Sequence, residues 1–316
     1  VTDYFDGDIT EIIVYNTELN NAQRIIVENY LAAKYGLTIT DDKYVFQGTH
    51  YYDVAGISQI NSTNLHTAAR SAGMLKISNA DDLDDGEYLL FGHDNGSIAS
   101  WTSTEVPNAD ANIRRIAQEW RLDETSDVGA ITISLDTSML PSLPAEFTSR
   151  VMWIDDDGDF SSGATQCPLT LNDTLYQYTN INPDDSAFIS FGIVRPVIQF
   201  STQNSNDNEP NTSINIEVTL NYALVNNATV DYTVTGGTAT GSGTDYTLAN
   251  GTATISSGST STNISISIVN DTDVESDETI IIELSNPSTG VTLGAIDSTV
   301  FTIHDDDSPR NIQFSA

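Results

Sequence analysis

Hydrophobic and polar residues alternate most regularly between residues 197 and 307. The apolar positions stand two apart in seven short runs: residues 197–200, 214–220, 230–234, 252–255, 264–268, 280–284 and 299–303. Successive side chains of a strand point to opposite faces, so this period predicts seven half-buried strands. Seven strands of this kind are enough for a sandwich of two sheets with an immunoglobulin-like topology.

Between residues 40 and 195 short runs rich in β-branched and aromatic residues alternate with turns. The runs cover residues 87–91, 114–122, 130–135, 150–154 and 187–191. This pattern predicts a second β-sandwich, of unknown function. The aromatic side chains of this region are scattered along the chain, which favours core packing over a ligand-stacking platform. The fold class is therefore all-β, as tandem β-sandwiches with one short helix near the N-terminus.

The N-terminal residues predict one strand and that helix. Residues 3–15 begin with a turn around Gly7 and continue as a β-branched run suited to a buried strand. Asn20 or Asn21 is the expected helix N-cap, and the apolar residues that follow recur at helical spacing until Gly36 ends the helix.

Four segments follow from these patterns. Residues 1–39 form the closing strand and helix of one domain, residues 40–195 a β-sandwich, residues 196–307 a second sandwich, and residues 308–316 a linker and first strand of a further repeat. Residues 312–315, Ile-Gln-Phe-Ser, repeat the sequence of residues 198–201. The sequence thus predicts a segment of a tandem array whose domains are interrupted at both ends.

Charge narrows the possible partners. The chain has forty-five acidic residues and only eleven lysines and arginines, which gives a formal net charge of −34. Such a surface repels nucleic acid and anionic lipid, so we expect no nucleic-acid partner. Hydrophobic residues make up 39% of the chain and no run reaches the length of a membrane helix, so we expect no membrane insertion. The single cysteine, Cys167, is expected to be a small buried apolar residue.

Several motifs occur in order within residues 197–307. They are Gly-Thr-Asp-Tyr at 243–246, Gly-Thr-Ala-Thr-Ile at 251–255, Asn-Asp-Thr-Asp-Val-Glu-Ser-Asp-Glu-Thr at 270–279, Leu-Ser-Asn-Pro at 284–287 and Asp-Asp-Asp at 305–307. This segment resembles a Calx-beta domain over nearly its whole length. The resemblance implies that acidic residues from loops at one end of the sandwich bind Ca²⁺. The matching positions are Glu209, Asp245, Asp271, Glu275, Glu278, Asp305, Asp306 and Asp307.

The chemistry of these positions agrees with that implication. Ca²⁺ takes six to eight oxygen ligands from carboxylates and carbonyls, and converging carboxylates repel one another without a cation. Asn270 stands where the family pattern has an aspartate, and Thr272 where members often carry a further acid. One or two ions are therefore expected, and a solvated acidic loop is the alternative.

A weaker metal candidate lies in the first sandwich at Asp155, Asp157 and Asp159. Their alternation is like the start of an EF-hand loop. Phe160 replaces the glycine of that loop, however, and Gln166 replaces its bidentate glutamate. An acidic hairpin turn is the favoured interpretation.

The sequence offers no catalytic motif. The four histidines lack metal-protease spacing, and there is no Gly-x-Ser-x-Gly elbow. The chain is therefore predicted not to be an enzyme.

Residues 1–39 also resemble the closing strand and trailing helix of laminin-G/concanavalin-like lectin domains in bacterial surface proteins, and residues 40–195 resemble the uncharacterised β-domain that follows them. These resemblances imply a secreted or cell-surface protein and a non-catalytic, calcium-binding adhesin stalk or filament. The expected partners are neighbouring domains of the array, other copies of the chain or cell-surface glycans. Two alternatives remain open, an accessory region of a polysaccharide-active enzyme and a self-assembling filament subunit.

Overall fold

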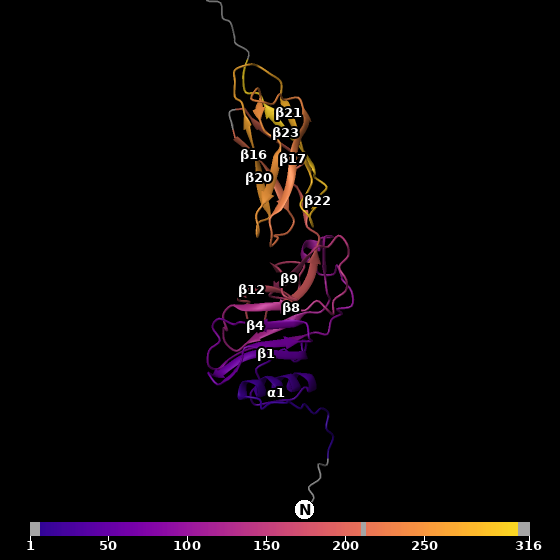
Figure 1. Ribbon diagram of the computed structural model, residues 1–316, viewed down its shortest axis with the longest axis vertical. Coiled ribbons are helices and arrows are strands. Elements are labelled where there is room, and N and C mark those ends of the chain that lie inside the picture. The colour runs from indigo at the N-terminus through magenta and orange to yellow at the C-terminus, as the bar shows by residue number, and fades with distance from the viewer. Residues whose placement is uncertain (1–6, 210–212, 309–316) are drawn as a thin grey trace, which may run out of the picture.

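Two β-sandwiches stand end to end along one long axis (Figure 1). This arrangement is seen in a computed structural model, which describes residues 7–209 and 213–308. The helix α1 (Asn21–Tyr35) covers the end of the first sandwich that lies away from the second. The all-β fold class predicted from the sequence is confirmed.

The first domain consists of two facing sheets. One sheet has the strand order β10-β9-β13-β7-β5-β1-β2, with β6 also paired to β13, and the other has the order β11-β12-β8-β4-β3. The strands are β1 (Tyr52–Asn61), β2 (Asn64–His66), β3 (Ala68–Ser71), β4 (Leu75–Ser78), β5 (Glu87–His93), β6 (Ile113–Arg115), β7 (Trp120–Glu124), β8 (Ile131–Leu135), β9 (Ser149–Asp155), β10 (Thr165–Pro168), β11 (Thr170–Asn172), β12 (Leu175–Ile181) and β13 (Phe188–Val194). A short 3₁₀ helix spans Pro107–Ala109. Each strand run predicted in this region overlaps one or two of these strands, and the run predicted over residues 114–122 is divided between β6 and β7.

The space between the two sheets is filled by large apolar side chains. Trp120, Phe191 and Leu75 are fully buried there, and the Trp120 indole N–H donates to Ser71 Oγ at 3.2 Å. Cys167 is also fully buried in this core, as its sequence context predicted.

Helix α1 begins and ends at the residues that the sequence indicated. The Asn20 side chain accepts from the Gln23 backbone N–H, the Gln23 side chain accepts from the Asn20 N–H, and Gly36 closes the helix with a φ of 64°. The helix packs on the outer face of β1 and β5 through Ile25 and Ala33. The six residues of β5 from Tyr88 to His93 are all buried, so both faces of the sheet are buried at this strand. One face packs against the second sheet, and α1 shields the other from solvent.

Two sequence predictions about the N-terminal part need correction. Residues 1–39 were assigned to a separate domain, but α1 shares a core with Tyr44, Val54 and Leu90 of the sandwich that follows. The boundary at residue 39 therefore divides residues that pack together. The strand predicted over residues 3–15 does not form within residues 7–15, where Ile12 and Val14 are 74% and 86% exposed. A β-branched run becomes a strand only where another strand pairs with it, and no described strand does so here.

Asn29 connects the helix to the loop that leads into the sandwich. It is fully buried, donates to the Asp41 carbonyl at 2.8 Å and accepts from the Lys43 N–H at 2.7 Å. Asn29→Ala would leave both backbone groups without partners. We expect a loss of about 2–4 kcal/mol in the free energy of unfolding, measured by denaturant titration. Glu28→Ala is the control, because it removes only a solvent-accessible ion pair with Arg24, and an equal loss in both variants would contradict this role.

The second domain consists of two five-stranded sheets, β18-β20-β16-β14-β22 and β15-β23-β21-β17-β19. Its strands are β14 (Val197–Phe200), β15 (Asn204–Asn208), β16 (Ser213–Leu220), β17 (Ala228–Gly237), β18 (Tyr246–Thr247), β19 (Gly251–Ile255), β20 (Ser261–Ile268), β21 (Glu278–Ser285), β22 (Thr292–Leu293) and β23 (Ser298–His304). The seven runs predicted from period-two alternation are confirmed as strands, and three short strands are added. The repeat seen at residues 312–315 lies outside the described residues.

Candidate metal centre

The loops at the free end of the second domain bring distant acidic residues together. β15 and β23 run parallel, so both end at the same edge of the domain, where the chain exits in Figure 1. Glu209 directly follows β15, and its N–H donates to the carbonyl of His304, the last residue of β23, at 3.2 Å. Parallel pairing thus places Glu209 beside the 305–307 segment, almost a hundred residues further along the chain.

Six of the eight predicted ligands form two carboxylate groups at this end. In each group, one carboxylate oxygen per residue lies within 4.8 Å of the other two. The first group is Glu209, Asp271 and Asp307, and the second is Asp245, Glu275 and Glu278. These separations are those of oxygen atoms that share one cation, and hard carboxylates are the ligands that Ca²⁺ prefers.

The first group contains a buried oxygen without a hydrogen-bond donor. Glu209 is 5% exposed, and its Oε2 has no hydrogen-bond partner among the described residues; the same is true of Asp307 Oδ2. Burial, and then the charges of Asp271 and Asp305, raise the pKa of Glu209. A buried carboxylate oxygen that lacks a donor is costly unless a proton or cation neutralises the charge, so these residues fit a bound cation.

The second group is held by the loop before β18. Asp245 is 8% exposed, its carbonyl accepts from Val269 N–H at 2.9 Å, and its carboxylate accepts from Thr240 N–H. Burial and a hydrogen bond to Asp245 raise the pKa of Glu278 to about 7. A proton on Glu278 makes this hydrogen bond possible, and a divalent cation would take its place.

The remaining two predicted ligands have other positions. Asp305 accepts from the backbone N–H of Glu275 at 2.8 Å and of Asp307 at 3.0 Å, so it orders the loop that carries members of both groups. Asp306 is exposed and belongs to neither group. The bond from Asp307 N–H to the Asp305 carboxylate forms a local turn, and of the three adjacent acids only Asp307 enters the first group.

Residues 196–307 contain neither lysine nor arginine. Their only basic side chain is that of His304, which lies 2.8 Å from Asp277 Oδ2. The domain therefore has no arginine or lysine of its own to neutralise the negative charge of the carboxylates at its free end. Their neutralisation depends on protons or on cations from solution.

The weaker candidate in the first domain has a different structure. Asp155 Oδ1 accepts from the N–H groups of Asp157 and Gly158 at 3.0 and 2.7 Å, and Asp157 Oδ1 accepts from Asp159 N–H at 2.8 Å. Asp159 accepts in turn from Ser161 N–H at 3.1 Å. These oxygens cap the backbone of a turn, and the three residues form no metal-ligand group in the described part of the chain. The geometry is that of the acidic hairpin turn.

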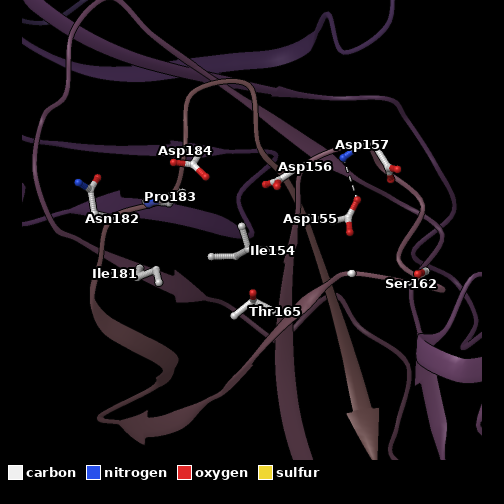
Figure 2. Close-up of a pocket in the computed structure, with 11 residues that line it drawn as sticks. Ile154, Asp155, Asp156, Asp157, Ser162, Thr165, Ile181, Asn182, Pro183 and Asp184 are labelled. Atoms are coloured by element: carbon white, nitrogen blue, oxygen red, sulfur yellow. Dashed lines mark hydrogen bonds between the residues drawn. The ribbon is translucent and has the colours of Figure 1, made fainter.

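A hollow lined by acidic side chains lies beside this turn. Figure 2 shows Asp155, Asp156 and Asp157 on one side and Asp184 on the other, around a pocket of about 330 Å³. A neighbouring pocket of about 400 Å³ is lined by Glu124 and Asp127, and burial together with Asp127 raises the pKa of Glu124 to about 7. Sequence reasoning missed this second pocket, because its residues come from separate turns that carry no common motif.

Models of two known families match the chain, one in each domain. The fold and the site define a class of protein: a tandem β-sandwich that carries two groups of carboxylates at one end. Residues 194–307 match the family model of the Calx-beta domain. Residues 23–187, a little more than half of the chain, match the model described as "Domain of unknown function (DUF8202)", so the chain belongs to this family.

Solved structures similar to the chain include Calx domains. The apo form of the Calx CBD1 domain is 28% identical, with 35% of this chain and 98% of that one covered and a TM-score of 0.34. CBD12 from CALX1.2 is also 28% identical, with 35% and 45% covered and a TM-score of 0.33. A search of curated proteins finds no match. No comparison confirms the lectin resemblance of residues 1–39 or the bacterial surface-protein resemblance of residues 40–195.

Proposed function

We propose that the free end of the second domain binds Ca²⁺, and that the chain is a non-catalytic structural segment of an adhesin stalk or filament outside the cell. The observation that carries the proposal is the pair of carboxylate groups at the loop ends, with the buried, donor-free Glu209 oxygen in one of them. The Calx-beta match over the same residues supports it.

Each of the two carboxylate groups would bind one Ca²⁺ ion. Glu209, Asp271 and Asp307 would hold one ion, and Asp245, Glu275 and Glu278 a second. A bound cation neutralises charges that the domain cannot neutralise with its own basic residues. Since the first group joins the ends of β15 and β20 to the segment that leaves β23, binding would also order the exit of the chain from the domain.

An elongated segment suits a stalk. The described N- and C-terminal ends lie at opposite ends of the long axis (Figure 1). Within residues 7–209 and 213–308 no helix has the length and apolarity of a membrane span. The proposed neighbours are further domains of the array, other copies of the chain or cell-surface glycans.

Calorimetric titration of chelator-stripped protein with CaCl₂ tests the site. We expect saturable binding of one or two ions. Glu209→Gln removes one ligand charge from the first group and keeps the shape of the side chain. We expect it to weaken binding at one site at least tenfold, because Ca²⁺ affinity depends on ligand charge.

The matched control is Glu217→Gln. Glu217 is an exposed carboxylate on β16 of the same domain and belongs to neither group, so its variant should bind Ca²⁺ as the wild type does. Equal weakening in both variants would indicate nonspecific attraction to an acidic surface. Absence of binding by the wild type would refute the proposed function.

A further inference from the structure

The two sandwiches are joined without a linker. β13 of the first domain ends at Val194, and β14 of the second begins at Val197, so only Arg195 and Pro196 lie between them. The N–H of Arg195 donates to the Asn112 carbonyl at 2.9 Å, and the Pro196 carbonyl accepts from Thr292 N–H at 2.9 Å. The connecting residues are therefore hydrogen-bonded to both domains.

Tyr222 inserts from the second domain into a core of the first. It follows β16 in sequence, is 5% exposed, and packs in one cluster with Val106, Trp153, Phe160 and Val194. Burying an aromatic ring in the neighbouring domain provides much more contact than a surface interaction between modules.

The hydroxyl group of Tyr222 fixes the orientation of the ring. It donates to Asp110 Oδ2 at 2.7 Å, while Asp110 Oδ1 accepts from the backbone and side chain of Asn112 at 2.8 and 2.9 Å. Both oxygens of this carboxylate thus have partners, and Asn112 is the residue whose carbonyl holds Arg195. A charge-assisted hydrogen bond inside the joint limits rotation of one domain on the other.

Two further contacts surround the joint. Asn221 accepts from Val197 N–H at 2.7 Å and donates to the Arg195 carbonyl at 3.2 Å. Thr148 of the first domain donates from Oγ1 to the Gly290 carbonyl of the second at 2.7 Å. Tyr222 and Gly290 lie in two different loops of the second domain, so the contact between domains extends beyond a single point.

From these contacts we infer that Tyr222 pins the second domain to the first, so that the two sandwiches move as one rigid body whether or not a cation is bound. The proposed metal groups lie at the opposite end of the second domain from this joint (Figure 1). The joint contains no member of either group, and its contacts are complete without an ion. Its rigidity therefore does not rest on the proposed function.

Distance measurement between spin labels on the two domains tests the inference. Thr174→Cys in the first domain and Thr254→Cys in the second provide exposed attachment points, and the fully buried Cys167 is not labelled. We expect one narrow distance distribution in the wild-type background, with the same mean and width in CaCl₂ and in EDTA. Tyr222→Ala should broaden it strongly and shift its mean.

Tyr222→Phe removes the hydrogen bond to Asp110, and Thr148→Val removes the one to Gly290. These two variants test the inference if Tyr222→Ala does not fold. Both should broaden the distribution to a smaller extent. Tyr232→Phe is the matched control, since Tyr232 lies in β17 outside the joint and should leave the distribution unchanged. The inference is wrong if all three joint variants stay as narrow as the wild type, or if EDTA alone broadens the wild-type distribution.

Discussion

Calcium at about a hundred times its dissociation constant is expected to stabilise the second domain by about 2.7 kcal/mol for each site occupied. For a domain of this size, one site corresponds to a rise in melting temperature of roughly 10–20 °C. The reason is linkage, because the native loops bring the carboxylates of each group within 4.8 Å while the unfolded chain keeps them apart.

Differential scanning calorimetry in EDTA and in excess CaCl₂ measures this effect. Glu209→Gln combined with Glu278→Gln removes one charge from each group, and this variant should lose most of the rise. Glu217→Gln should keep the full rise. The same melting temperature in EDTA and CaCl₂ for the wild type would show that the carboxylate groups are solvated loops without a metal function.

Acidification is expected to stabilise the calcium-free protein and to weaken calcium binding. The pKa of Glu278 is raised to about 7 by burial and by Asp245, and those of Glu209 and Glu275 are also raised. At pH 5.5 the folded state therefore holds a proton on Glu278 that the unfolded state binds much less. The stability contributed by that proton is present at low pH and is lost as the pH rises through 7.

Calcium must displace the same proton. Between pH 7.5 and 5.5 we expect affinity at the second group to fall about 25-fold, which follows from one proton with a pKa of about 7. Titrations at the two pH values measure this change, and Glu278→Gln should reduce it strongly. Glu124 in the first domain also has a pKa of about 7, so Glu124→Gln serves as the control and should leave the change in affinity intact. Affinity that does not vary with pH would contradict the placement of Glu278 in the site.

The second domain could be predicted almost completely from its sequence. Each of its main strands buries one face, so residues such as Ile214, Ile216 and Val218 repeat at the period of two that the structure shows. Five of the six members of the two carboxylate groups lie in the ordered motifs of the sequence, and strand order brings the loops that carry them together. Asp305 and Asp306 were the exceptions among the predicted ligands, because which of three adjacent acids joins a group depends on the local backbone path.

The first domain was harder to predict from its sequence, because the contacts that determine its structure leave no periodic pattern. β5 is buried on both faces, so its sequence does not reveal that a helix covers it. Residues 9–15 have the composition of a strand, but pairing depends on a partner that composition cannot specify. Tyr222 was not predicted for a similar reason, since a single aromatic residue in a loop shows its role only when the neighbouring core is known.

The direct passage from β13 into β14 would determine the path of a pulling force applied at the two ends of the molecule. Tension applied between the two ends of the long axis passes along β13 and through Arg195 and Pro196 into the second domain. At the far side, β23 carries the load against β15, its parallel neighbour over five residue pairs. Parallel strands pulled along their length share the load among all their hydrogen bonds at once, whereas a hairpin opened from its end breaks them one by one. Under such a load, the joint pinned by Tyr222 would lie in the middle of the load path, and the carboxylate groups would lie where the chain leaves the second domain.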